Sequence, residues 1–574
     1  MIRNKYYFVA TITLIIIILL TTCNHDQNKK FSDKFTTVDS LFAKYDSAAP
    51  GCAIGIVYHG KLIYNKGYGM ADIENQILNT PDRLFDIAST SKQFTAFCIL
   101  LLQEQGKLSI EDKIKKYIPE LPDCYEPVLI KHLLTHTSGI RDHYDLMDLT
   151  GIEEVSSEEQ NWANHNYNEE NVFGILLKQK ELNFAPGTFH QYCNSGFYLA
   201  GKIIERISGL SLREFYKRNI FTPLGMNNTF LYNDSSFYNK NRTMGYSKAN
   251  HGYRRNLIKY ETYGDGQIMT NIYDMYLWDK NFYNNKLGQG NPEIITQAYT
   301  RGQLNNGQSV DYSIGGLEVS KYKGLIVIDR MGGTRGICSD IVRFPDQEFT
   351  VICLSNFDDL DPDPWRAALK IADLFLGQYY QNKTETSTTN EPSKREITLL
   401  KANVDKMVGI YFNDQSKDFF KITLKDGNLY LNSKKLIPID STCYKIENWS
   451  VKINFSQIST DSTKLYWQEF TFPDKEYIKR NIVKYDRNSL EKYTGDYNCS
   501  ELGLKCQIKR KINQLFLSDP DDKESVLEPL FRDTFKTSYR GKEIIVEFNL
   551  DVNNKKGVMS MNTDLLKNLR FNKQ

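Results

Sequence analysis

The sequence predicts an α/β (α+β) domain followed by all-β repeat domains. Up to about residue 380, apolar runs that flank turn residues are interleaved with segments of helical periodicity. A polar, Thr- and Ser-rich stretch then interrupts the chain, and short alternating strands follow it in two similar copies. The 574 residues leave room for roughly two to four domains of ordinary size.

The N-terminus has the composition of a targeting segment. "MIRNKYYFVATITLIIIILLTTC" starts with basic residues and continues as an apolar run to Leu20, short for a membrane span of about 20 residues. It resembles a bacterial lipoprotein signal (1–22) cleaved before Cys23, which then carries the lipid, although Thr22 departs from the usual small residue. A plain signal peptide and a short signal anchor are the alternatives. We expect a spacer over 23–35 and a lipid-anchored protein of the bacterial cell envelope, periplasmic or on the outer surface.

The predicted α/β domain covers residues 36–380. "AIGIVYHGKLIYNKGYG" places His59-Gly60 between two apolar runs, which indicates a hairpin. "GFYLAGKIIERISG" has helical apolar spacing and a glycine stop, and "STSKQFTAFCILLLQEQG" predicts a helix that ends at Gly106. Because apolar residues surround this last helix almost completely, we expect it at the centre of the domain.

A linker over 381–398, containing "NKTETSTTNEPSKRE", precedes the repeats. "VDKMVGIYF" matches "LEKYTGDYN", and Gly409 and Gly495 are each followed at the same interval by a strand pattern. This periodicity predicts two related β-barrels over 399–486 and 487–574, or two halves of one larger β structure.

Composition argues against several classes of ligand. The formal net charge of +2 gives no electrostatic case for nucleic acid. The ten cysteines are scattered without a CxxC pair, and the eight histidines form no HExxH pattern, so we expect no metal and no cofactor. Cys499 and Cys506 are close enough in sequence to pair, or equally to remain free.

Ser89 and Lys92 lie at the head of the predicted central helix. Unpaired backbone N–H groups at a helix N-terminus suit an oxyanion, and a side chain three residues on shares the same face. A desolvated lysine can relay the proton of a serine. The plainer interpretation is a helix-capping serine followed by a surface lysine.

Two later segments add polar groups of the kind that such a pair needs. "NFAPGTFHQYCNSGFYLAG" carries Tyr192 and Asn194 in a loop that runs into a helix, and "DRMGGTRGICSDIVRFPD" carries Gly332 and Gly333, whose lack of side chains lets a substrate backbone approach. Taken singly, the segments favour plainer interpretations: a core tyrosine with a helix-capping asparagine, and a glycine turn in a hairpin.

In this order and spacing the three segments resemble the motifs of the penicillin-recognising serine hydrolases, most closely the class C β-lactamase-like group of DD-peptidases, D-aminopeptidases and esterases. The resemblance spans about Val38 to Leu376 and includes "IKHLLTHTSGI" and "YGDGQIMTNIYDMYLWDKN". It implies an antiparallel sheet flanked by helices. The long β tail disfavours a penicillinase, since lactamases of this group usually have a single domain.

The resemblance also implies roles for individual residues. Ser89 is the implied nucleophile, Lys92 its proton relay and Tyr192 the general base or acid, and which of the last two takes the first proton is left open. Asn194 would bind the substrate amide carbonyl, and the backbone N–H groups of Ser89 and Gly333 would form the oxyanion hole.

Arg330 departs from the implied third motif, which usually begins with Lys or His. Arginine is always charged and binds carboxylates bidentately, so it can replace the cation beside Tyr192 and orient an acidic substrate terminus. It is also bulkier and can fill the site, so full activity is in question. We expect His136 to satisfy buried backbone groups, and Gly264 to Gly266 to form a turn beneath the site.

These expectations combine into an exported serine hydrolase that forms an acyl-enzyme on amide or ester bonds, as a peptidase, carboxypeptidase, D-aminopeptidase or esterase. Its partners would be a small peptide, amide or ester substrate and the membrane that holds its lipid. The alternative is a non-catalytic, penicillin-binding-like envelope lipoprotein that binds a peptide or cell-wall ligand.

Overall fold

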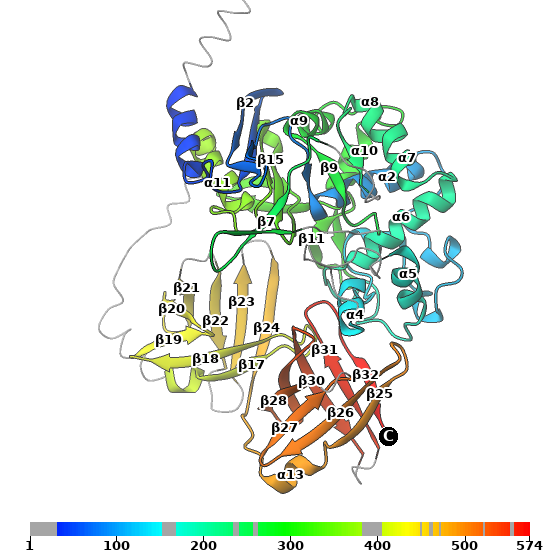
Figure 1. Ribbon diagram of the computed structural model, residues 1–574, viewed down its shortest axis with the longest axis vertical. Coiled ribbons are helices and arrows are strands. Elements are labelled where there is room, and N and C mark those ends of the chain that lie inside the picture. The colour runs from blue at the N-terminus through cyan, green and yellow to red at the C-terminus, as the bar shows by residue number, and fades with distance from the viewer. Residues whose placement is uncertain are drawn as a thin grey trace, which may run out of the picture.

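A computed structural model describes most of the chain beyond the N-terminal segment (Figure 1). The described residues are 31–151, 168–232, 240–256, 262–380, 404–447, 451–457, 463–469, 472–520, 523–551 and 556–574. The predicted signal, Cys23 and the linker 381–398 lie outside them. Within the described part, none of the helices combines the length and the apolar character that crossing a membrane requires.

The α/β domain is built on one large antiparallel sheet, as the family resemblance implies. Its β1–β2 hairpin turns at His59 and Gly60, whose φ angles of 48° and 70° suit a two-residue hairpin loop. The strands, in sheet order, are β10 (Arg301–Gln303), β11 (Ser309–Ser313), β12 (Glu318–Tyr322), β13 (Leu325–Asp329), β15 (Ile337–Phe344), β16 (Phe349–Ser355), β1 (Cys52–Tyr58) and β2 (Lys61–Tyr68), with β14 (Gly332–Thr334) paired to β15.

Helices cover both faces of this sheet (Figure 1). Along β1, Ile54 and Ile56 point into one core, with a helix over residues 31–42 and α11, whereas Ala53 and Val57 point into the other, with α2, α6 and α9. This alternation is the period-two pattern of a strand buried on both sides. The helices are α2 (Lys92–Glu104), α3 (Ile130–Leu134), α4 (His143–Leu149), α5 (Glu169–Leu177), α6 (Asn194–Ser208), α7 (Leu212–Tyr216), α8 (Thr222–Leu224), α9 (Ile272–Asn281), α10 (Glu293–Tyr299) and α11 (Pro364–Leu376).

Helix α2 is the central helix that the sequence predicts. Every residue from Lys92 to Leu102 is buried, and Gly106 follows its end with a φ of 68°. A short 3-10 turn, η1 (Ala88–Ser91), precedes it. The strand before this turn, β5 (Phe85–Asp86), pairs with β9 (Ile268–Thr270), so the loop before β9 lies beneath the head of α2.

Smaller elements complete the α/β domain. Strand β9 also pairs with β6 (Phe230–Leu231), and two further ribbons join β3 (Met70–Asp72) to β4 (Ile77–Leu78) and β7 (Gly245–Lys248) to β8 (Tyr253–Asn256). Short helical turns occur at η2 (Ile114–Lys116), η3 (Asp123–Tyr125), η5 (Lys217–Phe221), η6 (Pro345–Gln347) and η7 (Gly377–Tyr379).

The β tail forms two closed barrels, which decides between the two alternatives that its repeat left open. The first consists of β17 (Gly409–Phe412), β18 (Phe419–Lys425), β19 (Asn428–Leu431), β20 (Lys434–Pro438), β21 (Cys443–Ile446), β22 (Lys452–Ser456), β23 (Lys464–Glu469) and β24 (Phe472–Arg480). Helix α13 (Arg487–Glu491) leads into the second, formed by β25 (Gly495–Cys499), β26 (Leu504–Lys511), β27 (Gln514–Ser518), β28 (Glu524–Phe531), β29 (Thr534–Tyr539), β30 (Lys542–Leu550), β31 (Gly557–Asn562) and β32 (Leu569–Lys573). Closure leaves no sheet edge unpaired.

The same set of contacts, here called the closing corner, joins the first and last strands of both barrels, so the sequence repeat is also a structural one. In each copy a glycine begins the first strand, and the hydroxyl of a tyrosine two residues later donates to the carbonyl four residues before that tyrosine. A lysine of the last strand packs over the glycine and donates to a nearby carbonyl. The equivalent groups are Gly409, Tyr411 (to Met407) and Lys479 (to Lys406) in one barrel, and Gly495, Tyr497 (to Tyr493) and Lys573 (to Lys492) in the other.

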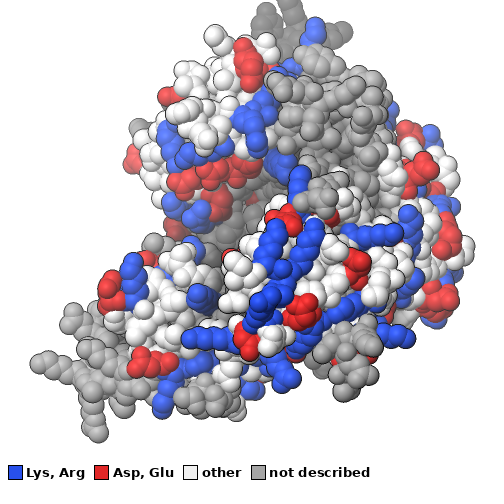
Figure 2. Space-filling view, turned by 60° about the horizontal axis from the view of Figure 1, so that its bottom comes forward, with Lys and Arg blue, Asp and Glu red and all other residues white. Residues whose placement is uncertain are grey.

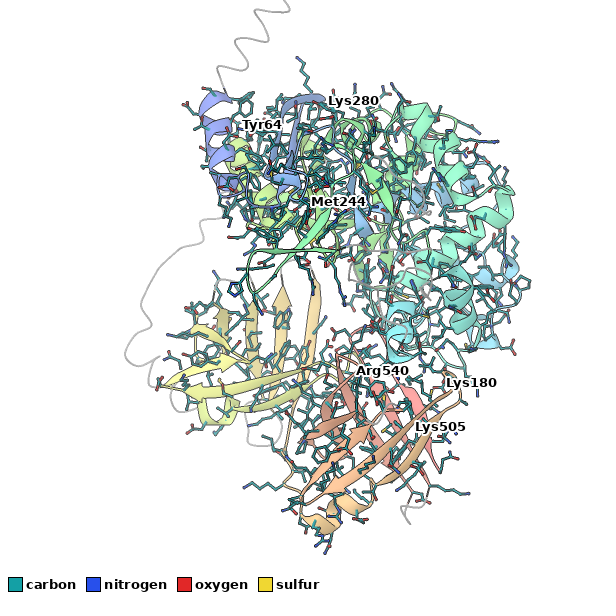
Figure 3. The ribbon with its side chains drawn as sticks, viewed as in Figure 1. Tyr64, Lys180, Met244, Lys280, Lys505 and Arg540 are labelled. Carbon is teal, nitrogen blue, oxygen red and sulfur yellow. The ribbon has the colours of Figure 1, made fainter. Side chains whose placement is uncertain are left out.

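The second barrel docks on the α/β domain through a buried ion pair. The side chain of Arg141 is fully buried, pairs with the Glu501 carboxylate and donates to the carbonyls of Lys567 and Asn568. At the rim of the junction, Lys180, which Figure 3 labels, donates to the Ser500 hydroxyl at 2.9 Å.

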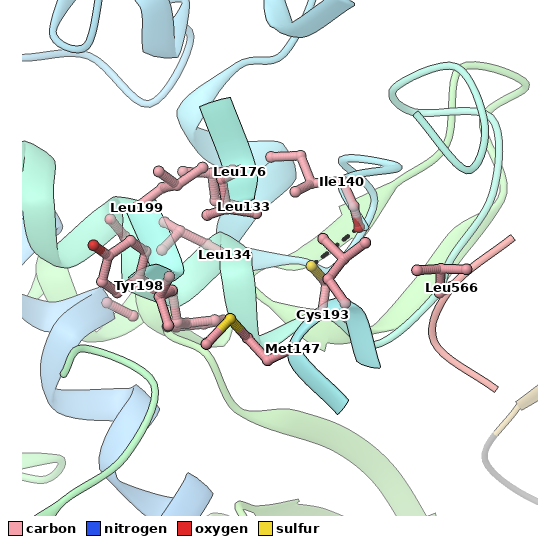
Figure 4. Close-up of a cluster of buried hydrophobic side chains, with 14 of the residues drawn as sticks. Leu133, Leu134, Ile140, Met147, Leu176, Cys193, Tyr198, Leu199 and Leu566 are labelled. Carbon is pink, nitrogen blue, oxygen red and sulfur yellow. Dashed lines mark hydrogen bonds between the residues drawn. The ribbon is translucent and has the colours of Figure 1, made fainter. Parts of the chain in front are cut away.

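Apolar packing continues across this junction. Leu566 of the second barrel belongs to the same buried cluster as Ile140 and Cys193 of the α/β domain (Figure 4). At the barrel end of the molecule the surface carries bands of Lys and Arg with Asp and Glu between them (Figure 2), in keeping with a formal charge of only +2. Cys499 and Cys506 are both free thiols in the second barrel.

We predict that Glu501→Ala weakens the docking of the second barrel by about 3–5 kcal/mol, because it leaves Arg141 buried without a carboxylate. Calorimetric unfolding of the full chain measures the effect. The control is Glu491→Ala, which removes the largely exposed partner of Arg510 and should cost only about 0–1 kcal/mol. Equal shifts for the two variants would contradict the prediction.

Candidate active site

Ser89 is presented by a constrained turn. Ala88, immediately before it, has a φ of 43°, and its N–H donates to the Asp86 carboxylate at 2.8 Å. A non-glycine residue in this left-handed region costs about 1–3 kcal/mol, so the surrounding structure must hold the turn in place. Ser89 follows within η1 and lines the cavity described below.

Lys92 is buried and all its hydrogen-bonding capacity is used. Its ammonium Nζ donates to Ser89 Oγ (3.0 Å), Asn194 Oδ1 (2.8 Å) and the Asp265 backbone carbonyl (2.5 Å). An ammonium group has three N–H donors, so each has an acceptor. Asp265 lies in the Gly264–Gly266 turn, which is therefore located beneath the site, as the sequence analysis expects.

Tyr192 and Asn194 reach the site from the segment that begins α6. The Tyr192 hydroxyl donates to Ser89 Oγ at 2.8 Å, so Lys92 and Tyr192 converge on the same oxygen. Asn194 is the first residue of α6, and its backbone N–H donates to the Asp142 carboxylate at 2.5 Å.

The contacts of His136 link it to the segment of Tyr192 rather than to Ser89. Its Nδ1 accepts from the Cys193 backbone N–H (3.1 Å), and its ring lies 4.4 Å from that of Tyr192. Burial lowers the pKa of His136 well below its usual range, which keeps the ring neutral. Its contacts are those of the buried, backbone-satisfying residue that the sequence predicts.

Arg330 is also buried, with a residue exposure of 1%. Its Nη2 donates to the Tyr192 hydroxyl (3.2 Å) and its Nε to the Ser89 carbonyl (3.1 Å), and Nη1 lies 3.7 Å from Glu318 Oε1. The cation expected beside Tyr192 is therefore present. Arg330 also lines the cavity described below, and its binding of an acidic substrate terminus stays a prediction.

Gly332 and Gly333 lie on β14 and meet different surroundings. A Cβ on Gly332 would fall 2.2 Å from the Ile87 carbonyl oxygen and 2.7 Å from the Thr90 nitrogen, so only glycine lets β14 pack against η1. A Cβ on Gly333 would find its nearest atom at 3.9 Å. The packing of β14 against the turn that carries Ser89 thus requires Gly332, and the approach of a substrate backbone to this pair of glycines stays a prediction.

A cavity of about 550 Å³ lies beside these groups, and Ser89, Tyr192, Asn194, Arg330, Gly332 and Gly333 line it. The second barrel supplies part of its wall, through Lys542 and Leu565. No sequence pattern indicates Lys542, Leu565, Glu318 or the Asp265 carbonyl as part of the site, because their positions depend on barrel docking, strand register and main-chain geometry. Among the described residues, no group of three or more His, Cys, Asp or Glu side chains is arranged to hold a metal ion.

An α/β domain with a Ser-x-x-Lys pair at the head of a buried helix, joined by a tyrosine and an asparagine, is the architecture of the penicillin-recognising serine hydrolases. Comparison with known families agrees: the model described as Beta-lactamase matches residues 38–374. The chain belongs to the beta-lactamase family.

Individual relatives fit this assignment. Penicillin-binding protein 4* of Bacillus subtilis is 29% identical over 439 residues, which cover 71% of this chain and 90% of the relative. A D-aminopeptidase of Brucella anthropi is 26% identical over 330 residues, covering 57% of this chain and 59% of that enzyme, so the match spans less than two thirds of its length. The octameric penicillin-binding protein homologue of Pyrococcus abyssi shares the fold, with a TM-score of 0.52 and 22% identity over 85% of this chain and 97% of its own.

We predict that Gly332→Ala destabilises the protein by about 1–3 kcal/mol and lowers covalent labelling of Ser89, because the added methyl group forces β14 away from η1. Gly333→Ala is the matched control and should change stability by no more than about 0.5 kcal/mol. Thermal unfolding and labelling with a fluorescent fluorophosphonate provide the measurements. A fully stable Gly332→Ala protein would show that the close approach does not constrain the site.

Proposed function

We propose that the protein is an exported hydrolase that cleaves amide or ester bonds through an acyl-enzyme on Ser89. The observation that carries the proposal is the convergence of Lys92 and Tyr192 on Ser89 Oγ, at 3.0 and 2.8 Å. A nucleophile within hydrogen-bond reach of its proton acceptor, which other groups hold in place, is the arrangement that covalent catalysis requires.

Tyr192 is the better placed proton acceptor of the two. Lys92 donates all three of its N–H groups and so has no lone pair for the Ser89 proton. The Tyr192 oxygen receives a hydrogen bond from Arg330 at 3.2 Å, and the Lys92 ammonium lies 5.2 Å from its ring. We assign the proton-acceptor role to Tyr192 in its deprotonated form, in which the 2.8 Å contact carries the Ser89 proton towards the phenolate and the Arg330 hydrogen bond stabilises that oxygen.

The proposed reaction then has two stages. As the Ser89 proton passes to Tyr192, Oγ attacks the substrate carbonyl, and the backbone N–H groups of Ser89 and Gly333 stabilise the oxyanion. Tyr192 returns the proton to the leaving amine or alcohol, which departs and leaves the acyl-enzyme. Water, activated by the same tyrosine, hydrolyses the ester and regenerates Ser89. Asn194, oriented by Lys92, would bind the substrate's amide carbonyl.

Covalent labelling tests this proposal. We predict that a fluorophosphonate and a fluorescent penicillin label the wild-type protein and fail to label Ser89→Ala. Tyr192→Phe keeps the ring and loses the hydroxyl, so its turnover of a nitrophenyl ester should fall by about 10²–10⁴-fold. Absence of labelling and of turnover with every probe would instead support the non-catalytic envelope binding protein.

We also propose that a lipid on Cys23 anchors the protein in a bacterial envelope membrane, on the basis of the signal-like composition of residues 1–22. We predict that Cys23→Ser moves the protein from the membrane fraction to the soluble fraction, as immunoblotting of fractionated cells would show. Retention of the variant with membranes would favour an uncleaved signal anchor.

A further inference from the structure

The cavity beside Ser89 has an acidic lining. Five of its side chains are carboxylates and two are cations; the carboxylates are Asp86, Asp145, Asp148, Asp265 and Glu318, and the cations are Arg330 and Lys542. Such an excess of one sign in a partly enclosed cavity focuses the field on a bound ligand and selects the opposite charge.

Both lining cations already have carboxylate neighbours. Lys542 pairs with Asp145 and, at 2.7 Å, with Asp148, and in doing so it links the second barrel to α4. Arg330 is held by the Tyr192 hydroxyl and the Ser89 carbonyl and faces Glu318. Within the described lining, a substrate carboxylate would therefore find only cations that already have partners.

Glu318 is a lining carboxylate that is accessible and only loosely paired. Its side chain is 22% exposed, against 7% for that of Asp145, and its ion-pair contact with Arg330 is 3.7 Å, longer than a hydrogen bond. Asp148 is similarly exposed, at 25%, but lies 2.7 Å from Lys542. Arg330 in turn contacts both Ser89 and Tyr192, so the Glu318 carboxylate lies one side chain away from the reacting groups.

The surroundings of Glu318 offer it little additional positive charge. Its cross-strand partner Asp329 lies on β13, and Asp340 lies on the neighbouring β15. Burial, together with repulsion between these acids, raises the pKa values of Asp329 and Asp340 well above their usual range. Asp311 on β11 pairs with Arg301, and Tyr312 lies opposite Glu318 in the β11–β12 register.

We propose that Glu318 binds an ammonium group of the substrate, so that the enzyme prefers amides or esters with a free amine close to the scissile carbonyl. This inference rests on the proposed acyl-enzyme function of Ser89. It is opposite to the preference for an acidic substrate that Arg330 suggests in the sequence. Both side chains line the cavity, but Arg330 is buried and already contacts Tyr192, Ser89 and Glu318, whereas the Glu318 side chain is 22% exposed.

Three matched substrates test the preference in the wild-type protein. They are alanine p-nitroanilide with a free amine, its N-acetyl form and its N-succinyl form, each as both enantiomers. We expect kcat/KM to fall in that order by at least about tenfold per step for the preferred enantiomer. A flat or reversed order, in a protein whose Ser89 is labelled by fluorophosphonate, would overturn the inference and leave the proposed function standing.

Substitution of the carboxylate identifies the group responsible. Glu318→Gln keeps the shape and removes the charge, so the ratio of kcat/KM for the free-amine and acetylated substrates should fall towards one, and Glu318→Asp should restore part of it. Glu348→Gln, on the exposed turn between β15 and β16, makes the same charge change outside the cavity and should leave the ratio unaltered.

The order of kcat/KM values of the wild-type protein for the three substrates tests the preference for a substrate amine even where Glu318→Gln does not fold. A Glu318→Gln protein that folds and keeps the wild-type ratio would overturn the role of Glu318. Absence of both labelling and turnover in the wild-type protein would overturn the proposed function and this inference together.

Discussion

The buried ammonium of Lys92 is the constraint on which the organisation of the site depends. A charge without water is tolerated only where hydrogen-bond acceptors surround it, and this one has three, from Ser89, Asn194 and the Asp265 main chain. These acceptors come from the head of α2, the start of α6 and the loop before β9. Satisfying one cation therefore brings together three segments that lie far apart in the sequence.

Contacts from His136 and Arg330 hold the Tyr192 side chain next to Lys92. His136 holds the backbone next to Tyr192 and packs against its ring, while Arg330 joins the hydroxyl to the carbonyl of Ser89. The Arg330 guanidinium thus links the segment that carries Ser89 to the segment that carries Tyr192. Arginine generally binds carboxylates strongly, but the Arg330 guanidinium is buried and already bonded to groups of the protein.

The sequence predicts the parts of the molecule that depend on local pattern, and misses those that depend on register and docking. The His59–Gly60 hairpin, the buried helix after Ser89 and the duplicated β tail follow from periodicity and turn chemistry. The meeting of Tyr192 with Ser89 follows from the motif resemblance and agrees with the 2.8 Å contact. In the sequence, nothing distinguishes Glu318 from an ordinary strand residue, because it comes to lie beside Arg330 only through the pairing of β12 with β13. Likewise, nothing in the pattern around Lys542 indicates that a distant barrel reaches the cavity.

The closing corner that the two barrels share indicates how the β tail arose. Matching glycine, tyrosine and lysine contacts in both copies point to one ancestral unit that was copied in tandem. Counted from Tyr411 as from Tyr497, the place of Glu501 is taken by Gln415, so the acid that meets Arg141 belongs to one descendant alone. The two copies therefore differ in their contacts: the second barrel meets the α/β domain through the Arg141–Glu501 pair and contributes Lys542 and Leu565 to the cavity, whereas the first has no acid at the equivalent position, Gln415.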